Sequence, residues 1–173
     1  MIIAISGLSG SGKSTIAKSI SECLNIPLVI SCTTRPPRPG EINGIDYHFM
    51  SIDEFAFTDV VARQDFVVAN GETWSYGFRK NDLKNDCIAV MTPSGIEELK
   101  KIYEREFIDI MIAVDDNIRM KRIFDRHDNQ SKEEIERRDK ADKILFKKYI
   151  PSIVVYNNGS LDDAIKIIAR VLK

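Results

Sequence analysis

The segment ISGLSGSGKST near the N-terminus combines closely spaced glycines with a lysine and hydroxyl side chains. Gly7, Gly10 and Gly12 keep side-chain bulk out of the loop, so consecutive backbone N–H groups can turn toward phosphate oxygens. Lys13 is spaced to reach the terminal phosphates of a nucleoside triphosphate, and the Ser14 hydroxyl is a ligand suited to Mg²⁺. The chemistry indicated is the binding of ATP together with Mg²⁺.

The residues around this loop agree with that interpretation. Residues 1–5 form an apolar run typical of a buried strand, and residues 14–24 have helical periodicity. The helix N-terminus would then face the phosphates. A glycine-rich turn that matches by chance is the alternative, and the flanking elements disfavour it. The residues expected to bind ATP here are Gly7, Ser9, Gly10, Ser11, Gly12, Lys13, Ser14 and Thr15.

Apolar segments that alternate between strand-like and helix-like run through the rest of the chain, which indicates an α/β domain with a parallel sheet. Strands are predicted at residues 1–5, 27–31, 87–91, 108–114 and 153–156. Helices are predicted at residues 14–24, 93–104, 117–124, 132–148 and 161–172.

The middle of the chain is less regular. Residues 32–44 are polar and rich in proline, which excludes a helix, and residues 46–50 look extended. Ser51 is the expected N-cap of a short helix, with Glu54 at the capping-box position. Two further extended segments, residues 66–69 and 73–78, flank an Asn-Gly turn.

Size and charge narrow the class of protein. The 173 residues, 43% of them hydrophobic, predict one domain with one core. With 25 basic and 26 acidic residues the net charge is −1, so we expect no general attraction to nucleic acid or to an anionic membrane. Three cysteines without metal-type spacing favour a reducing compartment, and we expect a cytoplasmic protein. The apolar N-terminal run is too short to span a membrane.

A second cluster suited to phosphate lies in the segment SCTTRPPRPGEINGIDYHF, which begins at Ser31. Arg35 and Arg38 can form fork-like, charge-assisted hydrogen bonds to a nucleoside monophosphate, a dianion that needs more than one fixed donor. Ser31 and Tyr47 add neutral hydroxyl donors. An ordinary solvated loop is the alternative.

This segment resembles the pattern S-x-TTR-x-PR-x-GE-x-x-G-x-DY-x-F of guanylate kinases, and the resemblance extends more faintly over nearly the whole chain. It implies an α/β P-loop kinase whose parallel sheet is flanked by helices. The single domain, 1–173, would comprise a core (1–31 and 87–173), a small monophosphate-binding region (32–86) and a helical lid near 122–138. The resemblance implies that the acceptor phosphate is bound by Ser31, Arg35, Arg38, Tyr47 and Tyr76. For Tyr76, packing is an alternative.

Four arginines surround a polar segment that could fold over a bound triphosphate. Such arginines stabilise the charge of a phosphoryl group in transfer and help to exclude water. The resemblance implies Arg126 and Arg138 as the first choices and Arg122 and Arg137 as the second. Relative to the family, the chain carries a one-residue insertion between the arginine at the start of this region and the one in the following helix. A solvated helix with i,i+4 ion pairs is the alternative interpretation.

The chain departs from the family where guanine is recognised. Guanylate kinases have a glutamate before the Tyr-Gly pair, a small hydroxyl residue after it, and acidic residues ending the next strand. This chain has Val67 or Val68, Phe78, and Val90 with Thr92. A carboxylate accepts from two adjacent guanine donors, and an apolar side chain cannot. Glu72 and Thr92 are candidate replacements. A pocket of valine and phenylalanine would suit a pyrimidine, including one substituted at its 5-position.

The roles of three further residues remain open. Asp115 and Asp116 are possible second ligands for Mg²⁺, although ATP oxygens, Ser14 and water would be adequate. Asn157 lies in the region where the family approaches the adenine of ATP, and a turn residue is the alternative.

The hypothesis from the sequence is an ATP-dependent nucleoside monophosphate kinase without a covalent intermediate. Lys13, Mg²⁺ and the lid residues Arg126 and Arg138 would stabilise the transferred charge. The resemblance implies GMP or dGMP as acceptor. The alternatives are a pyrimidine or modified deoxynucleoside monophosphate, another phosphorylated acceptor, or a non-catalytic binding module. The sequence leaves a monomer and a homodimer equally open.

Overall fold

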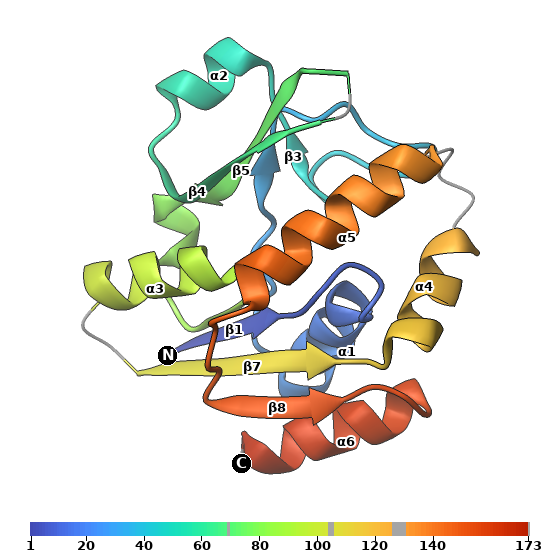
Figure 1. The fold of residues 1–173 in the computed structure, drawn as a ribbon. Coiled ribbons are helices and arrows are strands. Elements are labelled where there is room, and N and C mark those ends of the chain that lie inside the picture. The colour runs from blue at the N-terminus through green and yellow to red at the C-terminus, as the bar shows by residue number, and fades with distance from the viewer. Residues whose placement is uncertain (69, 104–105, 126–130, 173) are drawn as a thin grey trace.

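The computed structural model describes residues 1–68, 70–103, 106–125 and 131–172, which form two sheets and the helices around them (Figure 1). The larger sheet has the order β6-β1-β7-β8, and each neighbouring pair in it is parallel. Its strands are Ile2–Ser6 (β1), Cys87–Val90 (β6), Phe107–Ala113 (β7) and Ile153–Tyr156 (β8). The central strand β1 is buried along its whole length, as expected for a parallel sheet covered on both faces.

Successive side chains of β1 enter two different cores. Ile3 and Ile5 pack against α1 and α6, whereas Ile2 and Ala4 pack toward α3 and the base of the smaller sheet. This alternation is the period of two of a strand. The helices around the sheets are Lys13–Leu24 (α1), Ile52–Phe57 (α2), Pro93–Ile102 (α3), Asp116–Phe124 (α4), Lys132–Phe146 (α5) and Leu161–Val171 (α6).

The smaller sheet lies above the larger one, and α5 runs along it and ends beside α3 (Figure 1). Its order is β3-β2-β5-β4, and its strands are Cys32–Thr33 (β2), His48–Phe49 (β3), Val60–Val67 (β4) and Thr73–Arg79 (β5). The long hairpin of β4 and β5 supplies most of the pairing. All four strands fall within the region predicted to bind the monophosphate, and the division into core, monophosphate region and lid stays a prediction.

Most predicted elements are confirmed. The strands predicted around β1, β6, β7 and β8 and the helices around α1, α3, α4, α5 and α6 are present, with ends that differ by a few residues. Ser51 caps α2: its hydroxyl accepts from the Glu54 amide at 3.1 Å, and the Glu54 carboxylate accepts from the Ser51 amide at 2.7 Å. Residues 69 and 104, at predicted element ends, lie outside the described residues.

Two expectations about strands are wrong. The strand predicted at 27–31 is reduced to a single bridge between Leu28 and Ile88, because Pro27 has no N–H to donate and the chain then leaves for the smaller sheet. Strand β4 begins at Val60, well before the predicted start at Phe66. A bulge after Val61 breaks the alternation that reveals a strand in a sequence.

Among the residues described, no helix is both long enough and apolar enough to cross a lipid bilayer.

Candidate active site

The loop between β1 and α1 requires glycine at positions where a side chain would collide with its surroundings. Gly7 has φ +149°, and a Cβ there would lie 2.6 Å from the carbonyl oxygen of Ile112. Gly12 is the N-cap of α1 with φ +86°, and a Cβ there would lie 2.6 Å from Nδ2 of Asn157. The loop therefore lies directly on the ends of β7 and β8, with its backbone fixed by close packing.

The first turn of α1, directly after this loop, carries three polar side chains, Lys13, Ser14 and Thr15. Lys13 Nζ lies 3.4 Å from the carbonyl oxygen of Leu8, so the side chain extends back over the loop. Ser14 and Thr15 are exposed in the first turn of the helix, where backbone N–H groups have no intrahelical partners. A helix N-terminus of this kind, with a lysine over it, is a site for an anion.

Asn157, which follows β8, lies beneath the loop. Its side chain is 3% exposed, and its amide nitrogen donates to the carbonyl oxygen of Ser11 at 2.9 Å. The backbone carbonyl oxygen of Asn157 accepts from Arg122 Nη2 at 3.0 Å. These contacts brace the phosphate loop. The expected role of Asn157 near the adenine of ATP stays a prediction.

Two side chains that the sequence did not single out tie the loop to the helices α4 and α5. Arg119 is only 1% exposed and donates to the carbonyl oxygen of Ser9 at 3.2 Å, to Asp116 at 3.0 Å and to Asp139. Asp142 accepts from the amide of Ser9 at 2.7 Å. The sequence does not reveal these contacts with Ser9. The segment EEIERRDKADK is typical of a solvated helix, and the i,i+3 spacing of Arg119 and Asp116 is typical of an ordinary surface ion pair.

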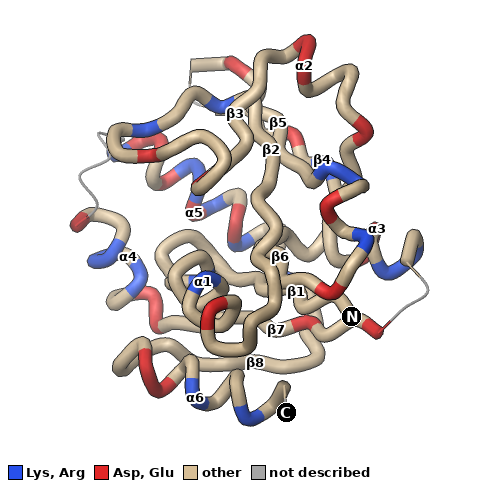
Figure 2. Tube along the Cα trace, turned by 180° about the vertical axis from the view of Figure 1, so that it is seen from behind, with Lys and Arg blue, Asp and Glu red and all other residues tan. Residues whose placement is uncertain are grey.

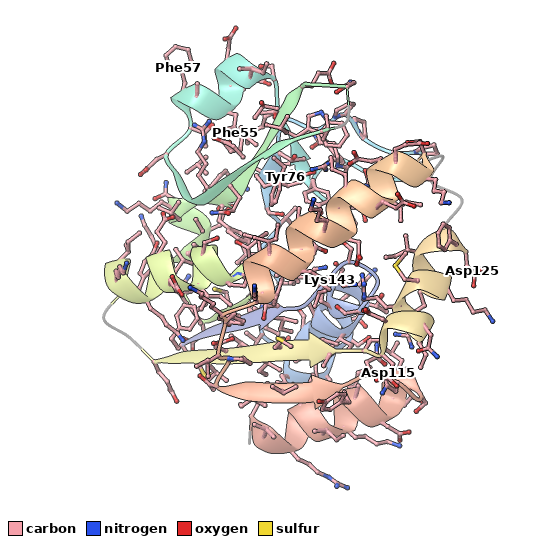
Figure 3. All side chains as sticks on the ribbon, viewed as in Figure 1. Phe55, Phe57, Tyr76, Asp115, Asp125 and Lys143 are labelled. Carbon is pink, nitrogen blue, oxygen red and sulfur yellow. The ribbon has the colours of Figure 1, made fainter. Side chains whose placement is uncertain are left out.

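Charged residues of both signs line α4 and α5 (Figure 2). Lys143, which is labelled in Figure 3, lies 3.0 Å from Asp116 and 3.1 Å from Asp139 and therefore links the two helices. The hydrogen bond from Lys143 and that from Arg119 lower the pKa of Asp116.

The segment after β2 holds its first arginine rigidly. Arg35 is 3% exposed, and its Nη2 donates to both oxygens of Glu41 at 2.8 and 2.9 Å. Glu41 also accepts from the Arg38 amide at 2.7 Å, so one carboxylate sets the shape of the whole turn. The Arg35 guanidinium lies 5.2 Å from the centre of the Tyr47 ring. Burial raises the pKa of Tyr47, and its hydroxyl therefore stays protonated and can donate.

Tyr76 comes to this cluster from β5. Pairing of Thr33 with Tyr76 aligns β2 with β5, and the Tyr76 ring packs edge-on against Tyr47 at 6.0 Å between centroids. In Figure 3 Tyr76 lies on the smaller sheet on the side of α5. The register of two short strands thus places a tyrosine next to an arginine more than forty residues earlier in the chain.

A cavity of about 210 Å³ joins the phosphate loop, the smaller sheet and α5. Its lining includes most of the side chains predicted to bind or transfer phosphate: Ser9, Lys13, Ser31, Arg35, Arg38, Tyr47, Tyr76, Thr92, Arg137 and Arg138. The backbone of Gly7 also lines it. The cavity brings together residues from five separate parts of the sequence. Their individual roles stay predictions.

The predicted lid arginines differ in position. Arg138 points to the loop, with Nη2 3.5 Å from the Ser9 hydroxyl, and Arg137 is bonded to Glu134 at 2.8 Å. Arg122 is bonded to the backbone of Asn157 and is not among the residues lining the cavity. Arg126, a first choice from the sequence, lies outside the described residues.

The far end of the cavity is apolar, where the chain departs from the family pattern. Val68, Phe78 and Val90 line it, whereas Val67 is 62% exposed and points away. Glu72, a proposed replacement for the missing acceptor, is exposed near the tip of the β4–β5 hairpin and is not part of the lining. Gln64, which the sequence did not single out, does line the cavity.

The oxygen atoms near Lys13 suit Mg²⁺. The exposed hydroxyl of Ser14 is a hard oxygen donor at the start of α1. Asp116 is bonded to Arg119 and Lys143, so it is a poor candidate for a second ligand. Within the described part of the chain, no group of three or more His, Cys, Asp or Glu side chains is arranged to hold a metal. The fit is that of a metal bound chiefly by nucleotide oxygens.

A strand, a glycine loop and a helix on a parallel sheet, with an arginine-lined cavity beneath a further helix, define a P-loop kinase fold. The family model for guanylate kinase matches residues 1–173, and the chain belongs to the guanylate kinase family.

Individual relatives agree with this assignment. The guanylate kinase of Clostridium perfringens (strain 13 / Type A) is 30% identical over 184 residues, which cover 99% of this chain and 82% of that protein. The guanylate kinase of Maricaulis maris is 50% identical over 56 residues, and this match spans 32% of this chain and only 26% of that protein.

Solved structures share the fold. A crystal structure of guanylate kinase from Anaplasma phagocytophilum matches with a TM-score of 0.72 at 20% identity and covers 99% of this chain and 84% of that one. A protein from Eubacterium ventriosum matches with a TM-score of 0.55 at 18% identity, over 99% of this chain and 98% of that one.

Proposed function

We propose that this protein is an ATP-dependent nucleoside monophosphate kinase, which transfers the γ-phosphoryl group of ATP to the phosphate of a nucleoside monophosphate. The observation that carries the proposal is the single cavity lined both by the phosphate loop, through Ser9 and Lys13, and by Arg35 and Arg38 opposite it. A donor site and an acceptor site that share one cavity suit direct, in-line transfer.

One group of side chains would bind the phosphates of ATP, and a second group would bind the phosphate of the acceptor. Lys13 and the amides of the loop would hold the β- and γ-phosphates of ATP. Mg²⁺, bound by Ser14 and by ATP oxygens, would neutralise part of their charge. Arg35, Arg38 and the hydroxyls of Tyr47 and Tyr76 would hold the acceptor phosphate, which is already nucleophilic and needs no strong base.

The helix α5 would complete the site over the phosphates. Arg137 and Arg138 line the cavity from α5 and can approach the equatorial oxygens of the group in transfer. In this arrangement Asp142 bonds the Ser9 amide, which is one of the loop N–H groups that a phosphate would use. ATP binding would therefore replace the carboxylate of Asp142 with a phosphate oxygen and shift α5.

The names of the relatives imply GMP or dGMP as the acceptor. The second candidate is a monophosphate with another base, and the apolar lining formed by Val68, Phe78 and Val90 favours it. A non-catalytic binding module is disfavoured because the loop retains Lys13 and Ser14.

The test is a coupled assay of ADP formation with Mg-ATP and each common ribo- and deoxynucleoside monophosphate. We expect phosphorylation of at least one acceptor by the natural sequence and by Lys18→Ala, a control on the exposed side of α1. Lys13→Ala should abolish it. Equal rates for Lys13→Ala and Lys18→Ala, or no transfer to any monophosphate, would refute the proposal.

A further inference from the structure

The apolar end of the cavity contains one amide side chain in a defined position. Gln64 pairs with Tyr76 across the β4–β5 hairpin, so the two side chains share the face of the sheet that lines the cavity. Its neighbour Asp65 is on the opposite face and accepts from the Ser75 hydroxyl at 2.6 Å. Gln64 therefore lies beside the predicted acceptor-phosphate residue Tyr76, toward the apolar end.

A chain of hydrogen bonds fixes the orientation of the Gln64 amide. At the N-terminus of α3, the Gly95 amide donates to the Thr92 hydroxyl at 3.3 Å, and Thr92 and Ser94 hydroxyls lie 3.2 Å apart. Ser94 donates to Oε1 of Gln64 at 2.9 Å. At the other end of the amide, Nε2 donates to the carbonyl oxygen of Arg63 at 2.6 Å. A carbonyl only accepts, so the nitrogen must lie on that side.

These bonds leave a defined set of free groups on the amide. A glutamine side chain has two N–H donors and two acceptor lone pairs, and one of each is used by Arg63 and Ser94. One N–H donor of Nε2 and one lone pair of Oε1 remain free, and both lie in the plane of the amide group. Such a pair complements an edge with two neighbouring groups, one donating and one accepting, as in the N3 and 4-substituent of a pyrimidine.

We propose that Gln64 selects the base of the acceptor and that the base is a pyrimidine, held at its N3 and 4-substituent by the free donor and acceptor of the amide. The proposal rests on the proposed function in placing a nucleoside monophosphate here. It goes further by naming the residue and the class of base. The rings of Phe66, Trp74 and Phe78 supply the apolar walls against which the base would pack.

Guanine fits this end of the cavity less well. The free groups of Gln64 can satisfy the carbonyl and ring N–H of guanine, but guanine carries an amino donor beside them, whereas a pyrimidine has a 2-carbonyl, an acceptor, at the corresponding place. The carboxylates that line the cavity, Glu134 and Asp142, both belong to α5 and are bonded to Arg137 and to the Ser9 amide. The amino group would face apolar walls without a carboxylate partner, which costs about 10- to 100-fold in affinity.

The single tryptophan of the sequence makes binding of the base measurable without catalysis. Trp74 lines the cavity, so its fluorescence should respond to a bound monophosphate when ATP is absent. We would titrate UMP, dTMP, CMP, GMP and AMP, with inorganic phosphate as a probe of the phosphate end alone. The expected result for the natural sequence is at least about 10-fold tighter binding of one or more pyrimidine monophosphates than of GMP.

Three variants test the role of Gln64. Gln64→Leu should weaken pyrimidine binding by about 10-fold and leave phosphate binding unchanged. Gln64→Glu, which offers two acceptors, should shift the preference toward GMP. Ser94→Ala keeps the amide and removes one of its bonds, and it should reduce selectivity in the same direction by a smaller factor. Asn85→Ala, at an exposed amide in the turn before β6, is the matched control.

The outcomes separate this inference from the proposed function. Tighter binding of GMP than of every pyrimidine, or unchanged selectivity in folded Gln64→Leu, overturns the role of Gln64 even if the protein is a kinase. Selective pyrimidine binding without any phosphoryl transfer supports the base assignment and refutes the kinase. Thermal unfolding of each variant identifies any loss of the fold. If Gln64→Leu does not fold, Ser94→Ala tests the role of Gln64 instead, and unchanged base selectivity in that variant overturns it.

Discussion

The two ends of the cavity are built in different ways. At the proposed phosphate end the loop backbone would bind the phosphates, and buried groups from other elements hold it in place, namely Asn157 after β8 and Arg119 in α4. At the base end, side chains on one hairpin form the surface, and a single amide, Gln64, supplies hydrogen bonds from β4. A backbone site tolerates little change in sequence, whereas a site made of a few side chains can alter its specificity by substitution.

This difference explains why the chain matches its family in one place and departs from it in another. Phosphate is the same in every nucleotide, so the glycine loop and the Arg35–Arg38 turn retain the family pattern. Bases differ in their donors and acceptors, and Val68, Phe78 and Val90 stand where the pattern has polar side chains. The two ends can therefore be tested separately by substitutions that affect one and spare the other.

The largest effect should come from removing the charge at the phosphate end. Lys13→Ala should lower kcat by about 10²- to 10³-fold, because a fixed positive charge on the group in transfer is lost. The relative preference among bases should not change. Steady-state kinetics with two monophosphates measure both quantities, and Lys18→Ala is the control. A changed base preference in Lys13→Ala would contradict the independence of phosphate binding and base selection.

The buried support of the phosphate loop should matter next, and it should appear in stability. Arg119→Met leaves Asp139 without its buried partner and should lower the free energy of unfolding by about 3 kcal/mol. Denaturant titration measures this, with Arg170→Met on the exposed face of α6 as the control. If both variants unfold at the same denaturant concentration, Arg119 does not brace the loop.

A smaller effect is expected where the acceptor phosphate is held. Arg35→Lys keeps the charge but loses the planar guanidinium, whose Nη2 bonds both oxygens of Glu41 while its Nη1 bonds the carbonyl oxygen of Pro36. The KM for the monophosphate should rise by about 10-fold, while the KM for ATP stays the same. The two KM values from initial rates decide this. An equal rise in both would place Arg35 outside the acceptor site.

The smallest effect is the pH dependence of the contact between α4 and α5. The bonds from Lys143 and Arg119 lower the pKa of Asp116 from its ordinary value of 3.8. The pairing therefore stabilises the folded state fully above about pH 4, and this contribution is lost as the pH falls through the lowered pKa. Asp116 is 61% exposed, so the contribution is modest.

Acid titration of Asp116→Asn tests this dependence. The difference in stability between the natural sequence and the variant should be constant from pH 5 to 7 and shrink below about pH 4. A difference that grows on acidification would contradict the pairing. Base selectivity should not follow this titration, because Gln64 has no charge.

The sequence predicted the phosphate end better than the base end for physical reasons. Glycine, lysine and serine at fixed spacing leave few structures open, and the same holds for arginines in a turn closed by Glu41. The position of Gln64 depends instead on the register of β4 with β5 and on a bulge after Val61, which no local pattern reveals. Arg119 was missed because its pairing with Asp139 depends on how α4 packs against the next helix, α5, which no local pattern shows.

The helix α5 illustrates the same limit. Its composition suggested a solvated surface, yet Asp142 and Arg138 contact Ser9 in the phosphate loop from this helix. Helical periodicity shows which residues share a face, but it does not show what that face meets. Packing against a loop more than a hundred residues away is decided by the fold.

In the proposed function, the phosphate loop and the Arg35–Arg38 turn bind two substrates in one cavity for direct transfer. Phosphorus NMR of the protein with Mg-ATP and the preferred monophosphate tests it most directly. We predict the appearance of a nucleoside diphosphate and ADP in equal amounts, dependent on Lys13 and without release of inorganic phosphate. ATP hydrolysis to ADP and inorganic phosphate, with the monophosphate unchanged, would contradict the account.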